Sequence, residues 1–144
     1  MICFSNSIGI FGLETFQIKV EADVSDGFPS FDIVGLPDTA VKESRDRVRS
    51  AMKNNGFSFP DGKITVNLAP ANVRKEGSVY DLPIFMALLQ HSGVLNTTLN
   101  DSVFIGELSL GGEIRGIHGV LPMVIKAKEE KFKNIVLHFF LTFC

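Results

Sequence analysis

The chain has 144 residues, of which 45% are hydrophobic and 21% are charged, and its formal net charge is -2. This length favours a single domain, and the near balance of 14 basic and 16 acidic side chains excludes a polybasic protein of the histone type. Cys3 and Cys144 lie at opposite ends and form neither a disulfide framework nor a zinc-binding pattern. Because no signal peptide and no apolar run of about 20 residues is present, we expect a cytoplasmic protein with reduced thiols.

The first third of the chain predicts β-strands. A short strand is expected over residues 2–10, and apolar and polar residues then alternate over residues 16–24. A turn signal follows, and apolar residues alternate again over residues 31–35, so these last two segments predict a hairpin. The alternation of Ile64, Val66 and Leu68 predicts another strand.

Three helices are predicted. The first runs from Asp38 or Thr39, either of which can cap its free N–H groups, to about Asn54. The second begins near Asp81 and is apolar all round, which predicts burial in the middle of the domain. The third is predicted over residues 120–132. Before it, a strand over residues 103–110 pairs in a hairpin with residues 113–115, and after it a closing strand covers residues 134–137. This order predicts a two-layer α/β fold with a mixed sheet and about three helices.

Sequence motifs for cofactor or metal chemistry are missing. Neither a P-loop nor the dinucleotide-binding glycine pattern occurs, so no residue is predicted to bind a cofactor. The three histidines, His91, His118 and His138, have no carboxylate or thiol at a ligand spacing, so no metal site is predicted.

Ser78 and Asp81, just before the buried helix, allow two interpretations. Ser78 is a candidate nucleophile if a base such as Lys126 folds next to it. Alternatively, Ser78 belongs to the loop and Asp81 caps the helix, which is the usual role of these residue types at such positions and the interpretation that we favour.

Basic residues recur on one face of the first predicted helix. Lys42, Arg45, Arg49 and Lys53 follow one another at steps of three and four residues, which places them in one stripe. The loop cations Arg74 and Lys75 add to this set of candidates. The stripe is either a solvated helix face, diluted by acidic neighbours, or a surface for nucleic acid or an acidic partner.

Three groups of segments together resemble a known family. They are Gly35-Leu36-Pro37-Asp38 with Arg47-Val48-Arg49-Ser50-Ala51, then Ile64-Thr65-Val66-Asn67-Leu68-Ala69-Pro70-Ala71 with Tyr80-Asp81-Leu82-Pro83-Ile84, and finally Gly106-Glu107-Leu108-Ser109-Leu110-Gly111-Gly112 with Ile114-Arg115-Gly116-Ile117. They resemble the N-terminal domain of YifB/ComM proteins, which are magnesium-chelatase-like AAA+ ATPases. The resemblance covers nearly the whole chain.

The resemblance implies a fold similar to the proteolytic domain of Lon proteases, shared with the second domain of a small-subunit ribosomal protein. Lon-type proteases use a serine before the central helix and a lysine at the start of the next helix. The corresponding positions are Asp81 and Leu121, and neither residue can supply that acyl chemistry. The resemblance therefore implies a protease-like domain without its catalytic pair, and hence no catalytic residue.

The resemblance also implies a larger protein around this domain. We expect residues 1–137 to form the Lon-like domain and residues 138–144 to form an anomalous apolar tail, as in a truncated or frame-shifted gene product. The AAA+ module, with its ATP and Mg²⁺, is expected outside this chain. The resemblance further implies a protein that forms hexameric rings and remodels DNA during recombination. Three roles follow, in order: an accessory domain that contacts DNA or neighbouring subunits through the basic helix, a structural ring-assembly domain, and a serine peptidase.

Overall fold

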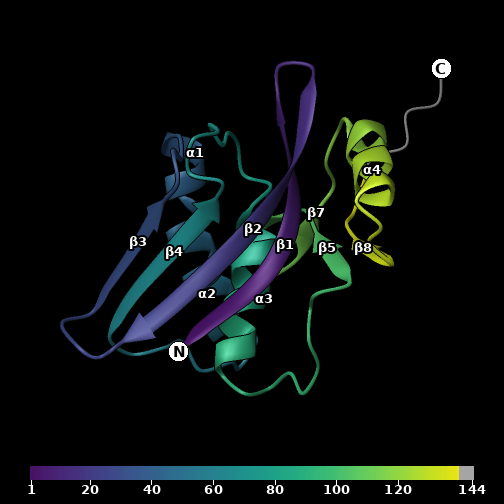
Figure 1. Cartoon of the computed structure of the whole chain (residues 1–144). Helices are drawn as coiled ribbons and strands as arrows, with labels where there is room; N and C mark the ends of the chain where they lie inside the picture. Colours follow the sequence, from purple (N-terminus) through teal and green to yellow (C-terminus); the bar gives the residue numbers. More distant parts are fainter. Residues whose placement is uncertain (140–144) are drawn as a thin grey trace.

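Strands dominate the first half of the chain, and helices and short strands alternate in the second half (Figure 1). The computed structural model describes residues 1–139. The elements in chain order are β1 (Ile2–Phe11), β2 (Glu14–Ser25), β3 (Ser30–Val34), α1 (Thr39–Lys42), α2 (Ser44–Asn54), β4 (Lys63–Ala69), α3 (Asp81–His91), β5 (Ser102–Phe104), β6 (Glu107–Leu108), β7 (Ile114–Arg115), α4 (Val120–Glu129) and β8 (Asn134–Val136). The predicted mixed α/β class is confirmed.

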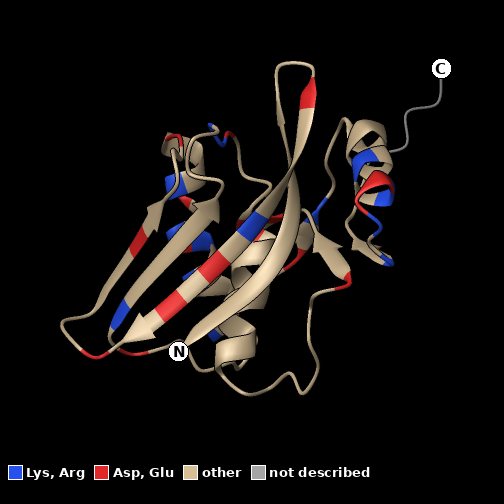
Figure 2. Ribbon diagram, viewed as in Figure 1, with Lys and Arg blue, Asp and Glu red and all other residues tan. Residues whose placement is uncertain are grey.

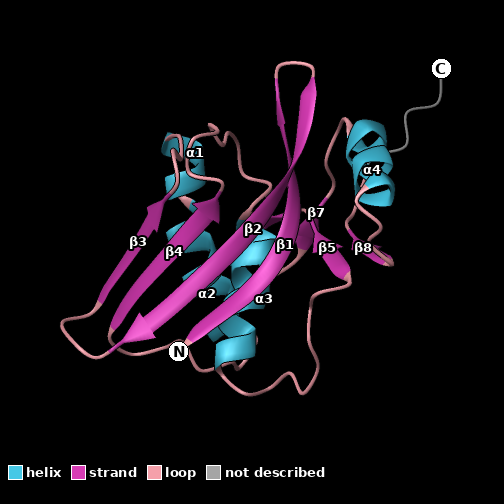
Figure 3. Cartoon of the chain, viewed as in Figure 1, coloured by secondary structure: helices cyan, strands magenta, loops and turns pink. Residues whose placement is uncertain are grey.

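The main sheet has four strands in the order β1-β2-β4-β3. Strands β1, β2 and β4 are successively antiparallel, whereas β3 and β4 are parallel and are joined through α1 and α2. Helices α2 and α3 lie behind this sheet in Figure 3, and its other face is open. The strand-helix-strand crossover explains why β3 and β4 run in the same direction.

The predicted hairpin between the second and third strands is wrong. Strand β4 lies between β2 and β3, and Val20 of β2 stands opposite Leu68 of β4. On the other side of β4, Ile33 of β3 stands opposite Val66. With β4 in the middle, the apolar residues of three strands lie on one face of the sheet and are buried together. A hairpin of β2 and β3 would leave β4 out of this face.

The first predicted helix is present, but it is divided at Glu43 into α1 and α2. Its start is confirmed: Asp38 is the N-cap, and its carboxylate accepts a hydrogen bond from the Val41 amide at 2.7 Å. The second carboxylate oxygen of Asp38 accepts from the Gly77 amide at 3.2 Å. The cap thus also ties α1 to the loop between β4 and α3.

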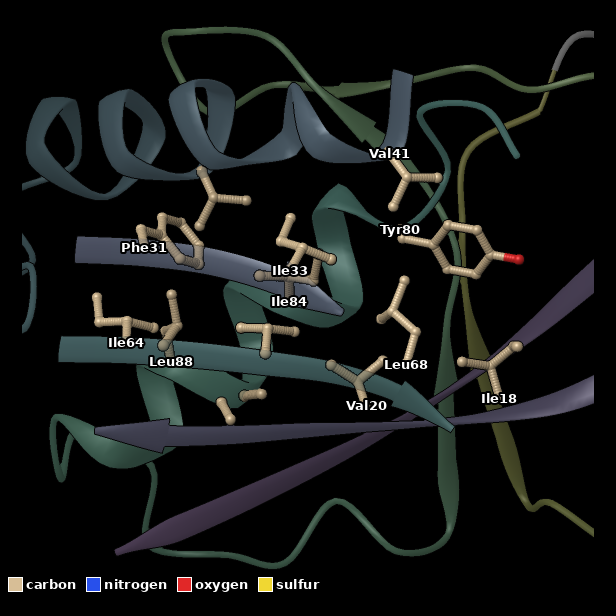
Figure 4. Packing of buried hydrophobic residues seen from close by; sticks show 14 of the residues in the cluster. Ile18, Val20, Phe31, Ile33, Val41, Ile64, Leu68, Tyr80, Ile84 and Leu88 are labelled. Atoms are coloured by element: carbon tan, nitrogen blue, oxygen red, sulfur yellow. The ribbon is translucent and has the colours of Figure 1, made fainter. Parts of the chain in front are cut away.

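The core lies between the main sheet and helices α2 and α3 (Figure 4). Residues of three strands, among them Val20, Phe31 and Ile64, pack there against Ile84 and Leu88 of α3. Seven of the eleven residues of α3 are buried, so the predicted central position of this helix is confirmed. Each fully buried aliphatic side chain contributes about 1.5–3 kcal/mol to stability relative to an exposed one.

The second half of the chain adds a smaller layer. Strand β5 pairs in parallel with β8, and β6 pairs with β7, so the single strand predicted over residues 103–110 is two short strands. Helix α4 packs on this layer through Met123 and Ala127. No helix within residues 1–139 has the length and apolar character needed to cross a membrane.

The first two residues of the predicted tail lie beside Ile117. The amide of Ile117 donates to the His138 carbonyl at 3.0 Å, and Phe139 forms a parallel bridge with Ile117. Residues 140–144 of the predicted tail, including Cys144, lie outside the described residues.

Candidate functional site: a buried ion pair and a basic face

The Asp81 carboxylate is the centre of a buried polar cluster. Asp81 is the first residue of α3 and is completely buried. One of its oxygens accepts from Ser44 Oγ at 2.5 Å and from Arg47 Nη2 at 3.1 Å. The other accepts from Arg47 Nε at 2.6 Å and from the Leu108 amide at 3.0 Å. The cluster therefore joins α2, α3 and β6.

The prediction that Asp81 caps its own helix is wrong. The N-cap position of α3 is Tyr80, which makes no side-chain capping bond, and both Asp81 oxygens accept from other elements. Burial raises the pKa of the Asp81 carboxyl, and its hydrogen bonds with Arg47, Ser44 and Leu108 act in the opposite direction. The same hydrogen bond with Asp81 is the main cause of a raised pKa at Arg47. A carboxylate held in this way is unavailable as a nucleophile.

Leu121, the second position that the family resemblance assigns to the Lon-type pair, lies on the surface. Its side chain is 69% exposed at the start of α4. There it lines an apolar groove of about 510 Å³ with Val120, Val124 and Phe139, among others. The groove is a candidate surface for contact with another protein segment.

Lys126 is a poor base for Ser78. Its Nζ atom lies 2.9 Å from a carboxylate oxygen of Glu130 on its own helix. This hydrogen bond raises the pKa of Lys126, whereas a lysine that acts as a general base needs a lowered pKa. The Ser78 carbonyl accepts a hydrogen bond from the Asp81 amide at 3.3 Å, so Ser78 belongs to the turn that begins α3.

Four of the six predicted basic residues form one row, which we call the basic row: Lys42, Arg45, Arg49 and Lys53. Lys42, Arg45 and Lys53 are exposed, and Arg49 is half-buried with its guanidinium 5.2 Å from the centre of the Phe59 ring. The row continues across the break between α1 and α2, since Arg45 Nε donates to the Lys42 carbonyl at 3.0 Å. In Figure 2 the blue segments of α1 and α2 lie behind β3 and β4.

The two remaining predicted cations do not join the row. Arg74 is exposed and pairs with Glu76 at 3.2 Å, in the loop that follows β4. Lys75 is completely buried, and its Nζ donates to the carbonyl of Gly35 at 2.7 Å and to that of Pro70. Burial lowers the pKa of Lys75. The prediction that Lys75 contacts nucleic acid or a partner is therefore wrong, because its charge faces backbone carbonyls inside the protein.

Two side chains of the buried cluster, those of Ser44 and Arg47, were not predicted as site residues from the sequence. Ser44 and Arg47 are three positions apart and therefore share one side of α2, and Val48 beside them is buried. The apolar Val48 next to Arg47 was the one feature of the sequence that could have indicated an inward-facing arginine. Among residues 1–139, no group of three or more His, Cys, Asp and Glu side chains is arranged to hold a metal ion.

Comparison with known proteins identifies the family. Residues 20–139 match the family described as subunit ChlI of Mg-chelatase. The chain belongs to this magnesium-chelatase ChlI family. The match includes the basic row, the Asp81 cluster and α4, so every site described above lies inside it.

Individual members agree with the resemblance to YifB/ComM proteins. The chain is 44% identical to the competence protein ComM of Haemophilus influenzae and 47% identical to the uncharacterized protein YifB of Escherichia coli, in each case over 87% of this chain and 25% of the relative. It is also 37% identical to the DNA repair protein RadA of Campylobacter jejuni, over 69% of this chain and 22% of RadA. The chain thus spans about a quarter of the length of these relatives.

Proposed function

We propose that this chain is a non-catalytic accessory domain of a magnesium-chelatase-like AAA+ ATPase that processes DNA, and that its basic row contacts DNA. The names of two relatives, a competence protein and a DNA repair protein, support the link to DNA. The chain covers about a quarter of those proteins, which leaves room for a separate ATPase module. ATP and Mg²⁺ would be bound by that module, and the ring of neighbouring subunits would form around it.

One observation carries the proposed contact: four cations of α1 and α2 line up on one exposed side of the molecule. Lysine and arginine side chains in such a row can neutralise successive phosphates and release condensed counterions, which gives sequence-independent affinity. None of the four has an ion pair with an acidic side chain among the described residues. Their charge is therefore available to a partner.

The non-catalytic part of the proposal has separate support. The position that matches the Lon-type serine is occupied by Asp81, whose oxygens are already paired, and Lys126 is engaged by Glu130 rather than by Ser78. We therefore expect a serine-reactive phosphonate probe to leave Ser78 unlabelled and casein to stay intact. Labelling of Ser78 would favour the peptidase role instead.

The binding test uses a fluorescent oligonucleotide at low salt. Arg45→Ala combined with Arg49→Ala should weaken binding of single- or double-stranded DNA by about tenfold or more, because two phosphate contacts are lost. The control is Lys128→Ala combined with Lys133→Ala, which removes the same charge in α4 and just before β8, across the molecule from β3 (Figure 1). Equal loss in both variants, or no binding by the unchanged protein, would contradict the proposed contact.

A structural assembly role is the second candidate, and the apolar groove beside Leu121 favours it. Exposed apolar surface of this kind commonly marks a protein contact. Under this alternative, sedimentation velocity at increasing concentration should show oligomers that Leu121→Lys disperses. A monomer at every concentration would count against assembly by this domain alone.

A further inference from the structure

Strand β3 is an open edge of the main sheet. It pairs only with β4, and its other side has no neighbouring strand within residues 1–139. The Ser30 amide donates to Gly62 at 3.2 Å, on the β4 side, so the backbone groups of Ser30, Asp32 and Val34 point toward β4. The amides and carbonyls of the intervening Phe31 and Ile33 therefore point outward, toward the free edge.

The basic row follows this edge from one end to the other. Lys42 and Arg45 line a groove of about 570 Å³ that also contains Asp32 and Lys63, at the end of β3. Arg49 and Lys53 line a second groove, of about 390 Å³, which includes Ser30 at the start of β3. The cations thus run antiparallel to the strand, and Arg45 Nη1 reaches the outward Phe31 carbonyl at 3.4 Å.

We infer that the free edge of β3 accepts an extended acidic peptide segment as an added strand, with its carboxylates on the basic row. The inference rests on the same row of cations as the proposed function and names a protein partner for that surface. The backbone of the added strand would pair with Phe31 and Ile33, and its amide would replace Arg45 on the Phe31 carbonyl. A nucleic-acid backbone has no amide to donate to that carbonyl, so pairing along this edge distinguishes a peptide from DNA bound to the same cations.

The spacing of the charges fits a strand. Alternate residues of a strand lie about 6.6 Å apart, and helical residues four positions apart are separated by about 6 Å along the axis. Acidic side chains at every second position of the added strand would therefore meet successive cations of the row. The intervening side chains would lie on the open face beside Asp32 and Val34, where a β-branched residue fits.

The test is a titration of the ¹⁵N-labelled chain with an alternating Glu/Val peptide. Binding should slow hydrogen exchange of the Phe31 and Ile33 amides. Two control peptides keep the composition: one has its acids in a single block, and the other is alternating but N-methylated at every second amide. Each control should bind about tenfold or more weakly, since paired carboxylates or backbone hydrogen bonds are lost. Arg45→Ala combined with Arg49→Ala should weaken the alternating peptide similarly, and Lys128→Ala combined with Lys133→Ala should not.

Three outcomes would overturn the inference: no binding of the alternating peptide, equal binding of the N-methylated peptide, or binding without protection of Phe31 and Ile33. The same protein samples are tested with an oligonucleotide. If DNA binds in a salt-sensitive manner and the alternating peptide does not, this inference fails while the proposed DNA contact stands. If the peptide binds with edge protection and DNA does not, the inference holds and the DNA contact fails.

Discussion

Helix α2 carries arginines in two opposite environments. Arg47 points inward, where its side chain is 20% exposed and pairs with the completely buried Asp81. Arg45 and Arg49, two positions before and after it, lie in the basic row along β3. Because all three residues are arginines, their different roles follow from what each side chain faces: a buried carboxylate for Arg47, and the molecular surface along β3 for Arg45 and Arg49. The inward arginine pairs with a buried carboxylate, and the outward ones are the candidates for contact with a partner.

The largest expected effect is on the inner side. Asp81→Ala leaves the Arg47 guanidinium without its carboxylate and leaves the Leu108 amide without an acceptor, which should lower the free energy of unfolding by about 3–5 kcal/mol. Urea denaturation measures this loss. The control is Glu43→Ala, which removes the other, exposed ion pair of Arg47 and should cost about 0.5 kcal/mol or less. Equal costs would contradict the distinction between the two environments.

Lys75 and Arg74 provide a second contrast between neighbours. Lys75→Ala removes the donor from the Gly35 and Pro70 carbonyls and should lower the free energy of unfolding by about 2 kcal/mol. Arg74→Ala removes only an exposed pair with Glu76 and should change it by less than about 0.5 kcal/mol. Thermal and urea unfolding of the two variants measure the difference, and a larger loss for Arg74→Ala would place Lys75 outside the core.

Tyr80, which precedes Asp81, tests the burial of this region by titration. Burial raises the pKa of Tyr80 above its ordinary value of 10.0. The stability that depends on the neutral phenol is therefore complete below pH 10.0 and is lost as the pH rises further. Tyr80 is the sole tyrosine, so tyrosinate absorbance reports this residue alone. It should appear only together with unfolding, and ionisation near pH 10.0 in the folded protein would contradict the account.

Only a small effect on stability is expected on the outer side of α2. Arg45→Ala combined with Arg49→Ala removes a long hydrogen bond to Phe31 and a ring contact with Phe59, so the free energy of unfolding should fall by less than about 1 kcal/mol. Circular dichroism during urea unfolding checks this. A large loss would mean that these cations hold the fold, as Arg47 does.

Local patterns in the sequence predicted most elements, because apolar alternation and helix caps act over a few residues. The alternation of Ile64, Val66 and Leu68 and the Asp38 cap are examples. The placement of β4 between β2 and β3 could not be predicted in this way, since it depends on pairing between segments far apart in the chain.

The same limit applies to the candidate site. The step of three and four residues predicted the basic row, because helix geometry is local. The burial of Lys75 depends on carbonyls at Gly35 and Pro70, which only the folded chain brings to its Nζ atom. The Asp81 cluster likewise joins Asp81 of α3 with Ser44 and Arg47 of α2 and with Leu108 of β6. Its donors therefore could not be assigned from the order of residues.

The salt dependence of DNA binding tests the central claim most directly. The slope of log affinity against log salt concentration is measured for the unchanged chain and for Arg45→Ala combined with Arg49→Ala. Each lost phosphate contact should reduce the magnitude of the slope by about 1, so the variant should differ by about 2. An unchanged slope, with the fold intact, would show that the basic row makes no contact with DNA phosphates.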